Sequence, residues 1–188
     1  GVLRESMGLG SEPDSEDYQK ITEVFDKAVA ELKAAGAEIV DPIVIPRLKE
    51  LLAKRAGSPT GGEESFNVYF GRSGNPPYKS REEVMRSPDF AKVTRHSQER
   101  WKRSSDVSRH YESLKAQDEL MTHLLKVMAD NRLDAVVHKT IEHQPTLIKD
   151  GINPPYVDQK GAPHLNTFLA FVPTITVPSG FTRDNLPA

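Results

Sequence analysis

The 188-residue sequence contains no cysteine, and this absence excludes several kinds of chemistry. A chain without cysteine has no disulfide framework, no thiolate metal site and no cysteine nucleophile. Its 25 Lys and Arg against 27 Asp and Glu give a net charge of −2, without the basic excess typical of proteins that hold nucleic acid through phosphates. The basic stretch 92–109 is interpreted as a solvated helix face. The sequence therefore predicts neither a thiol enzyme nor a nucleic-acid partner.

Long apolar runs are missing as well. No run approaches the roughly 18 residues that span a bilayer, and no signal peptide is visible. With 37% hydrophobic and 28% charged residues, the composition is that of a globular protein. We therefore expect a cytoplasmic protein with no membrane partner.

The motifs of common catalytic and metal centres are also absent. The nearest match to Gly-x-Ser-x-Gly surrounds Ser179 but lacks both framing glycines, so Ser179 is interpreted as a turn residue. None of the six histidines has a specific metal spacing; His138 and His143 flank Glu142 too loosely to indicate more than structural roles. No phosphate-binding glycine loop is present. The residues alone predict no metal ion, no organic cofactor and no catalytic centre.

The first forty residues alternate apolar and amphipathic segments. Residues 1–5 and 37–41 are predicted strands, and the helix between them starts at residues 12–15 and ends at Gly36. The apolar face of this helix is formed at spacings of four, three and four by Ile21, Phe25, Ala28 and Leu32. A strand, a helix and a strand in this order predict a right-handed crossover between parallel strands.

Further helices are predicted in the middle of the chain. Residues 46–54 are a short helix candidate, and Ser80 with Glu83 forms a capping box for a helix over 81–86. The longest predicted helix covers about residues 110–131, where apolar positions keep helical spacing.

The C-terminal part returns to apolar segments. Residues 133–137 are predicted to be a buried strand, followed by a long Pro/Gly-rich loop over 139–161, a short helix from Pro163 and a strand over 174–178. The chain opens inside a predicted strand and closes on a turn without a returning strand. We therefore expect a fragment of a longer protein.

Five segments resemble, in order and spacing, the amidase-signature family. Residues 1–6 resemble the strand after the family's signature region, and residues 24–40 its following helix and strand. Residues 133–137 resemble the strand that leads to a substrate-side loop; 164–168 and 173–181 resemble the late helix and the family's ending. The resemblance covers roughly half of the chain, and each piece alone has low specificity.

The resemblance implies an α/β fold with a mixed, mostly parallel sheet flanked by helices, present here as an incomplete C-terminal portion of the amidase-signature fold. Its parts would be residues 1–41 (strand, helix, strand), 42–131 (a variable helical segment) and 132–188 (strand, loop, helix, strand). Family members hydrolyse carboxamide C–N bonds to a carboxylate and ammonia or an amine, with a Ser–Ser–Lys triad and no metal or organic cofactor. That triad lies in a Gly/Ser-rich region which has no counterpart here, so no catalytic residue is assigned.

The resemblance leaves this chain the role of shaping the substrate pocket. The implied substrate-binding residues are Phe66, Tyr69, Thr140, Asn166 and Thr167. Small polar groups would orient the amide and aromatic rings would pack its apolar part; core packing is the alternative for Phe66 and Tyr69. The absence of an acidic residue close to Thr167 argues against a charged amino-acid amide.

The implied partners are a small-molecule amide substrate and the missing N-terminal part of the same protein, and a homodimer remains open. The competing hypothesis is a non-enzymatic α/β small-ligand-binding or scaffold module. An upstream lysine and a Gly/Ser-rich loop would favour the enzyme hypothesis over the binding or scaffold module.

Overall fold

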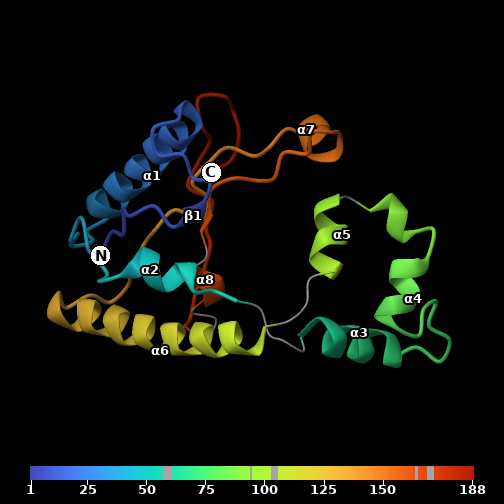
Figure 1. The fold of residues 1–188 in the computed structure, drawn as a ribbon. Helices are drawn as coiled ribbons and strands as arrows, with labels where there is room; N and C mark the ends of the chain where they lie inside the picture. The colour runs from blue at the N-terminus through green and yellow to red at the C-terminus, as the bar shows by residue number, and fades with distance from the viewer. Residues whose placement is uncertain (57–60, 94, 103–105, 164, 169–171) are drawn as a thin grey trace. The chain divides into compact units, whose positions relative to one another are not determined.

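The computed structural model describes residues 1–56, 61–93, 95–102, 106–163, 165–168 and 172–188 (Figure 1). The chain forms two compact units. Unit 1 comprises Gly1–Lys54 and Lys115–Ala188, and unit 2 comprises Arg55–Leu114. The predicted middle segment, 42–131, is therefore divided between the two units.

Helices dominate the described residues of both units. Unit 1 contains β1 (Gly8–Leu9), α1 (Glu16–Ala34), α2 (Leu48–Ala53), α7 (Ile148–Ile152), β2 (Ala162–Pro163) and α8 (Leu165–Phe168). Unit 2 contains α3 (Gly61–Gly71), α4 (Arg81–Arg86), the 3-10 helix η1 (Phe90–Lys92) and α5 (Arg95–Lys102). The longest helix, α6 (Val107–Asp130), begins in unit 2 and has most of its length in unit 1. Among the described helices, none has the length and apolar character needed to cross a membrane.

Helix α1 confirms the helix predicted between residues 12 and 36, because both of its ends carry local signals. The Ser15 hydroxyl accepts a hydrogen bond from the backbone N–H of Tyr18 at 3.2 Å, as an N-cap residue does. After the helix, Gly36 has φ +99°, and Ala37 N donates to Leu32 O at 3.1 Å. This is the Schellman arrangement, in which a left-handed glycine lets the chain satisfy the last carbonyls.

Three other predicted helices are confirmed with small shifts at their ends, whereas the short helix predicted from Pro163 is described only over Leu165–Phe168 and Pro163 itself lies in β2. Helix α2 lies inside the predicted range 46–54, and α6 begins three residues before the predicted position 110. Helix α4 matches its predicted range: the Ser80 hydroxyl accepts from Glu83 N at 3.2 Å, while the Glu83 carboxylate accepts from Lys79 N at 2.6 Å. The reciprocal bond of the capping box thus reaches one residue further back than expected.

The N-terminal segment is the centre of unit 1. Val2 forms a parallel bridge with Val137, and Leu3 forms one with Ile43. The bridges are closed by hydrogen bonds from Leu3 N to Val137 O at 2.9 Å and from Ile43 N to Val2 O at 2.8 Å. Because successive side chains of an extended chain point to opposite faces, Val2 and Leu3 enter two different apolar clusters.

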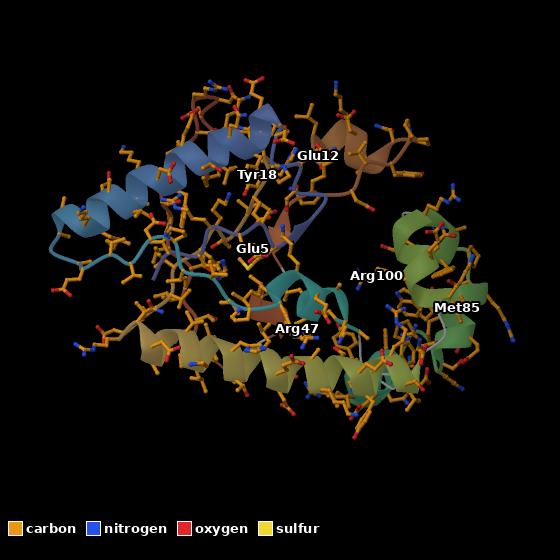
Figure 2. All side chains as sticks on the ribbon, turned by 60° about the vertical axis from the view of Figure 1, so that its left-hand side comes forward. Glu5, Glu12, Tyr18, Arg47, Met85 and Arg100 are labelled. Atoms are coloured by element: carbon orange, nitrogen blue, oxygen red, sulfur yellow. The ribbon has the colours of Figure 1, made fainter. Side chains whose placement is uncertain are left out.

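The two clusters involve different helices. Val2 is fully buried with Phe25 and Val29 of α1. Leu3 belongs to the larger cluster, whose helical members come from α2, α6 and α8: Leu48, Leu51, Leu52, Ala116, Leu120, Leu124, Val127, Leu165 and Phe168. Arg47, labelled in Figure 2, ties α2 to α6 through ion pairs with Glu50 and Glu119. The core of unit 1 is therefore helices packed against a short extended segment.

The predicted mixed, mostly parallel sheet flanked by helices is wrong. Helices make up about 48% of the structure. The contacts of residues 1–5 with 39–43 and 133–137 stay isolated bridges, and the only strands among the described residues are the antiparallel pair β1 and β2, two residues each. Pro42 is one physical reason, since proline has no N–H to extend a ladder.

The strand predicted over 174–178 is also wrong. It has no paired neighbour among the described residues, and Ile175 and Val177 are 88% and 65% exposed. Alternating apolar residues suit a half-buried strand only where a neighbouring strand and a core are present to receive them. The predicted loop 139–161 is largely irregular, as expected, but contains the short helix α7.

We predict that Gly36→Ala lowers the free energy of unfolding by about 1 kcal/mol, because an alanine Cβ strains a left-handed backbone even where space is open. Urea unfolding followed by circular dichroism measures the change. Gly151→Ala is the matched control in the same unit: its φ is not left-handed and its nearest neighbour is 3.9 Å away. Equal stability of the two variants would contradict the capping role.

Candidate functional site

A buried carboxylate joins the N-terminal loop to the loop after residue 138. Glu142 is 1% exposed. Its Oε1 accepts from Met7 N at 2.8 Å, and its Oε2 accepts from Gly8 N at 2.8 Å, from the Ser6 hydroxyl at 3.0 Å and from the Ser11 hydroxyl. A buried charge is tolerated only when it is well hydrogen-bonded. Glu142 thus fastens two segments that are far apart in sequence.

The backbone around this carboxylate is packed too closely for side chains. Gly161 has φ +67°, and a Cβ there would lie 2.7 Å from the backbone nitrogen of His143. Its carbonyl accepts from Glu142 N at 2.8 Å. Gly8 is equally confined, because its Cβ would lie 2.6 Å from the carbonyl carbon of Gly161. The Glu142 contact therefore depends on two glycines as well as on its donors.

Lys139 lies close to this carboxylate in sequence and is also buried, at 7% exposure. Its Nζ donates to the Thr22 hydroxyl at 3.2 Å and lies 3.6 Å from the centroid of the Tyr18 ring. Burial lowers the pKa of Lys139 to about 8, although the charges of Glu142 and Asp26 act in the opposite direction. Burial likewise raises the pKa of the Tyr18 hydroxyl.

The two carboxylates that influence Lys139 are already engaged. Asp26 pairs with Arg4 at 2.6 Å, and Glu142 receives its four donors from the N-terminal loop. Arg4 also donates two hydrogen bonds of 2.6 Å to the Asp41 carboxylate, and this contact lowers the pKa of Asp41. Among the described residues, no carboxylate lies within ion-pair distance of Lys139.

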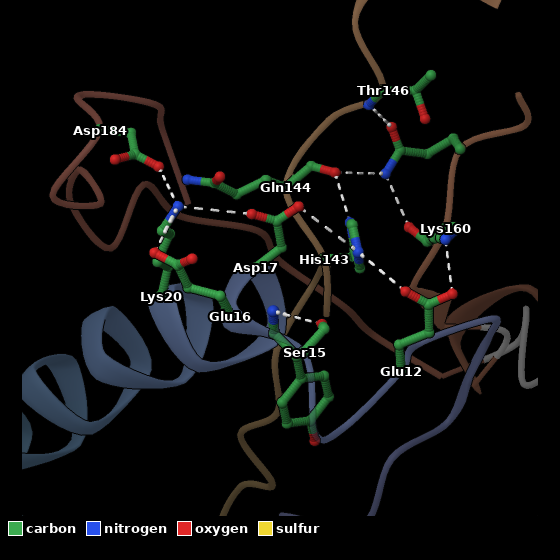
Figure 3. A network of polar contacts seen from close by, with 12 residues as sticks. Glu12, Ser15, Glu16, Asp17, Lys20, His143, Gln144, Thr146, Lys160 and Asp184 are labelled. Atoms are coloured by element: carbon green, nitrogen blue, oxygen red, sulfur yellow. Dashed lines mark hydrogen bonds and ion pairs between the residues drawn. The ribbon is translucent and has the colours of Figure 1, made fainter. Parts of the chain in front are cut away.

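A second buried lysine has the opposite surroundings. Lys20 of α1 is 8% exposed and is surrounded by the carboxylates of Glu16, Asp17 and Asp184 (Figure 3). Hydrogen bonding to Asp184 is the largest influence, and it raises the pKa of Lys20. The contact with Asp184 ties the C-terminal residues to α1.

His143 extends the same network on the other side. Its Nε2 lies 3.7 Å from carboxylate oxygens of both Glu12 and Asp17, and Lys160 pairs with Glu12 at 2.6 Å (Figure 3). The Lys160 contact lowers the pKa of Glu12. The loop over 139–161 therefore contacts Glu12 and Asp17 through His143 and Lys160, and contacts residues 6–11 through Glu142.

Two open hollows lie along the N-terminal loop and α1. The first, about 390 Å³, is lined by Pro13, Tyr18, Gln19, Thr22, Glu23 and Asp26. Figure 2 shows Tyr18 on α1 and Glu12 in the loop before it. The second, about 330 Å³, lies between the residues that wrap Glu142 and the α2 residues Lys49, Leu52 and Ala53. The first hollow is the one whose walls contact Lys139.

The residues predicted from the sequence for the pocket wall are distributed over both units. Phe66 is 6% exposed on α3, with its ring 4.5 Å from that of Phe70, and Tyr69 on the same helix is 72% exposed. Thr140 is exposed after the bridged segment of unit 1. Phe66, Tyr69 and Thr140 do not line either hollow. Asn166 and Thr167 lie on α8, and their side chains lie outside the described residues.

Sequence reasoning missed Lys139, Thr22 and Tyr18, and gave Glu142 no role. One signal was available: Lys139 and Glu142 both lie within five residues of the end of the apolar segment 133–137. In the described part, no three potential metal ligands converge. The hydroxyls of Ser6 and Ser11 donate to a carboxylate, and the amine of Lys139 meets a threonine. A serine–lysine pair therefore does not form among these residues.

The chain matches no protein-family model, no curated protein and no solved structure.

We predict that Glu142→Gln lowers the free energy of unfolding by about 2 kcal/mol. Glutamine replaces one carboxylate oxygen with an NH2 group, which cannot accept a hydrogen bond, so at least one buried backbone donor loses its acceptor. The control is Glu38→Gln, an exposed position where a change within about 0.5 kcal/mol is expected. The free energy of unfolding of both variants is measured by urea unfolding. Equal values for the two variants would contradict the role of Glu142.

Lys139 should give the protein a characteristic pH dependence. Its folded pKa of about 8 lies below the ordinary unfolded value of roughly 10.4, so the unfolded chain binds more protons between these pH values. The contribution of Lys139 to the free energy of unfolding therefore rises as pH rises through that window. The stability of the wild type minus that of Lys139→Met, measured by urea unfolding from pH 7 to 10, should increase by roughly 1–3 kcal/mol. A flat or falling difference would contradict the assignment.

Proposed function

We propose that this chain serves as the C-terminal part of an amidase-signature hydrolase. In the intact enzyme it would contribute scaffold and pocket wall to the hydrolysis of a carboxamide C–N bond to a carboxylate and ammonia or an amine. The Ser–Ser–Lys triad would come from a preceding part of the same protein. The proposal includes a small-molecule amide substrate, no metal or organic cofactor, and a cytoplasmic location.

The observation that carries the proposal is the uncovered apolar segment near the C-terminus. Ile175 and Val177 are 88% and 65% exposed, and Phe181, which forms an isolated antiparallel bridge with Pro187, is 67% exposed. These residues belong to the stretch 173–181, whose sequence resembles the ending of the family's sequences. Exposed apolar side chains that follow one another closely in sequence favour a surface that another part of a protein covers. We take the preceding part of the enzyme to be that cover.

The polar groups of unit 1 are consistent with a chain that provides scaffold and pocket wall, and they do not form a catalytic arrangement among the described residues. The hydroxyls of Ser6 and Ser11 are committed to Glu142, and Lys139 has Thr22 as its hydrogen-bond partner. A nucleophilic serine needs an adjacent base and an oxyanion site. Asn166 and Thr167 on α8 are proposed to orient the substrate amide.

The proposal is tested with a fluorophosphonate probe, which labels activated serines. The 188-residue chain and the protein produced with its upstream coding sequence are each treated with the probe and weighed by intact mass spectrometry. The longer protein should gain one probe mass, at a serine upstream of Gly1, and the 188-residue chain should gain none. In the longer protein, Asn166→Ala and Thr167→Ala should raise KM for amide substrates severalfold with less effect on probe labelling.

Three outcomes would overturn the proposal. They are labelling of the 188-residue chain itself, no labelling of the longer protein, and an upstream sequence without a lysine and a Gly/Ser-rich loop. The last two would favour a non-enzymatic ligand-binding or scaffold module.

A further inference from the structure

The ring of His143 is a junction between the N-terminal loop, α1 and the loop over 139–161 (Figure 3). Its Nε2 lies 3.7 Å from Oε2 of Glu12 and 3.7 Å from Oδ2 of Asp17, so two carboxylates from different segments face one ring nitrogen. The side chain of His143 is only 13% exposed, which limits the water that can compete for these contacts. The charge of this ring therefore affects how three segments of unit 1 are held together.

The other ring nitrogen determines where the first hydrogen of His143 lies. Its Nδ1 is 2.9 Å from the backbone carbonyl oxygen of Gln144. A carbonyl oxygen can only accept, so Nδ1 carries a hydrogen and donates it. The neutral ring then has its lone pair at Nε2, where it faces carboxylate oxygens that also can only accept. Only the protonated ring can donate on both sides.

Other charged groups surround the ring on every segment packed against it. Among the described residues, these are Glu12, Asp17, Lys20, Glu142, Lys160 and Asp184. Lys160 pairs with Glu12 at 2.6 Å, and Lys20 lies 3.6 Å from Asp17. Acidic side chains and lysines ordinarily titrate well outside the range of histidine, and the Lys160 contact lowers the pKa of Glu12 further. Between pH 5.5 and pH 8, the histidine is therefore the group of this network whose charge changes.

The segment that follows this junction, residues 145–160, is attached to unit 1 mainly through polar contacts. Hydrogen bonds inside the segment give it a shape of its own. Its apolar side chains on α7 contribute little to holding it, since Ile148 and Ile152 are 80% and 60% exposed. The charged contacts at its two ends are those of His143, just before the segment, and of Lys160. A segment with little apolar burial opens at a low free-energy cost.

We propose that His143 is a pH-sensitive latch. Its protonated ring holds residues 145–160 to the N-terminal loop and the start of α1 through Glu12 and Asp17, and loss of the proton loosens that segment. The latch is independent of the amidase proposal, because all of its groups lie within unit 1.

The geometry gives the direction of the pH effect. While the ring carries both hydrogens, His143 pairs with Glu12 and Asp17, and the attachment of residues 145–160 is strongest. Above the pH at which histidines ordinarily titrate, about 6.5, the lone pair on Nε2 faces two negative groups instead. The segment is therefore held most firmly at acidic pH and opens more often as the pH rises from 5.5 to 8.

The test is hydrogen–deuterium exchange of the intact chain, read by peptide mass spectrometry at pH 5.5 and at pH 8. The exchange rates of peptides from residues 145–160 are divided by the intrinsic rates at each pH, which leaves the protection that the structure provides. We expect this protection to fall about threefold from pH 5.5 to pH 8, because ion pairs with partly exposed carboxylates are modest interactions. Equal protection at the two pH values would overturn the proposal.

Two variants separate a latch from a merely structural histidine. His143→Gln removes the ionisable ring, whereas Glu12→Gln combined with Asp17→Asn removes both carboxylates and keeps the ring. In each variant the change in protection between pH 5.5 and pH 8 should disappear, whatever the absolute protection is. His123→Gln is the matched control, because His123 lies 3.5 Å from Glu119 in the same unit, and it should keep the wild-type pH dependence. A threefold change that survives in either test variant, or that disappears in the control, would overturn the proposal. If one test variant fails to fold, the other and the wild-type profile decide.

Discussion

Unit 1 depends on the burial of one carboxylate. Glu142 gathers two backbone N–H groups and two hydroxyls from the first residues of the chain, and no other buried charge in the described residues has as many donors. Because an unsolvated carboxylate is costly without such donors, the N-terminal loop and the loop after residue 138 must keep their shape together. The short β1–β2 pair and the confined Gly161 lie next to this contact.

The same contact explains why two lysines of similar burial differ. Glu142 is occupied by its own donors, and Asp26 is occupied by Arg4, so Lys139 is buried without a carboxylate of its own. Lys20 is placed where Asp184 and the first turn of α1 supply negative charge. The pKa of each buried lysine in this unit therefore depends on whether the nearby carboxylates already bind other groups.

The helices could be predicted from the sequence and the site could not, for one physical reason. Helix α1 is specified by neighbours in sequence, from the cap at Ser15 to the glycine at 36. Glu142 and Met7 are 135 residues apart, and no local pattern indicates that they meet. The sheet failed for a related reason: the apolar segments do pair at Val2 and Leu3, but an apolar pattern cannot tell a single bridge from a ladder.

The two units differ in how much of the chain must be synthesised before each of them can fold. Unit 2 is one continuous stretch, Arg55–Leu114, whereas unit 1 needs Gly1–Lys54 to meet Lys115–Ala188. On the ribosome, unit 2 can therefore complete its contacts while the first segment still lacks α6 and the carboxylate of Glu142. For that interval the segment Gly1–Lys54 would expose Leu3, Ile45 and Leu51, and exposed apolar side chains of this kind are what chaperones bind during synthesis.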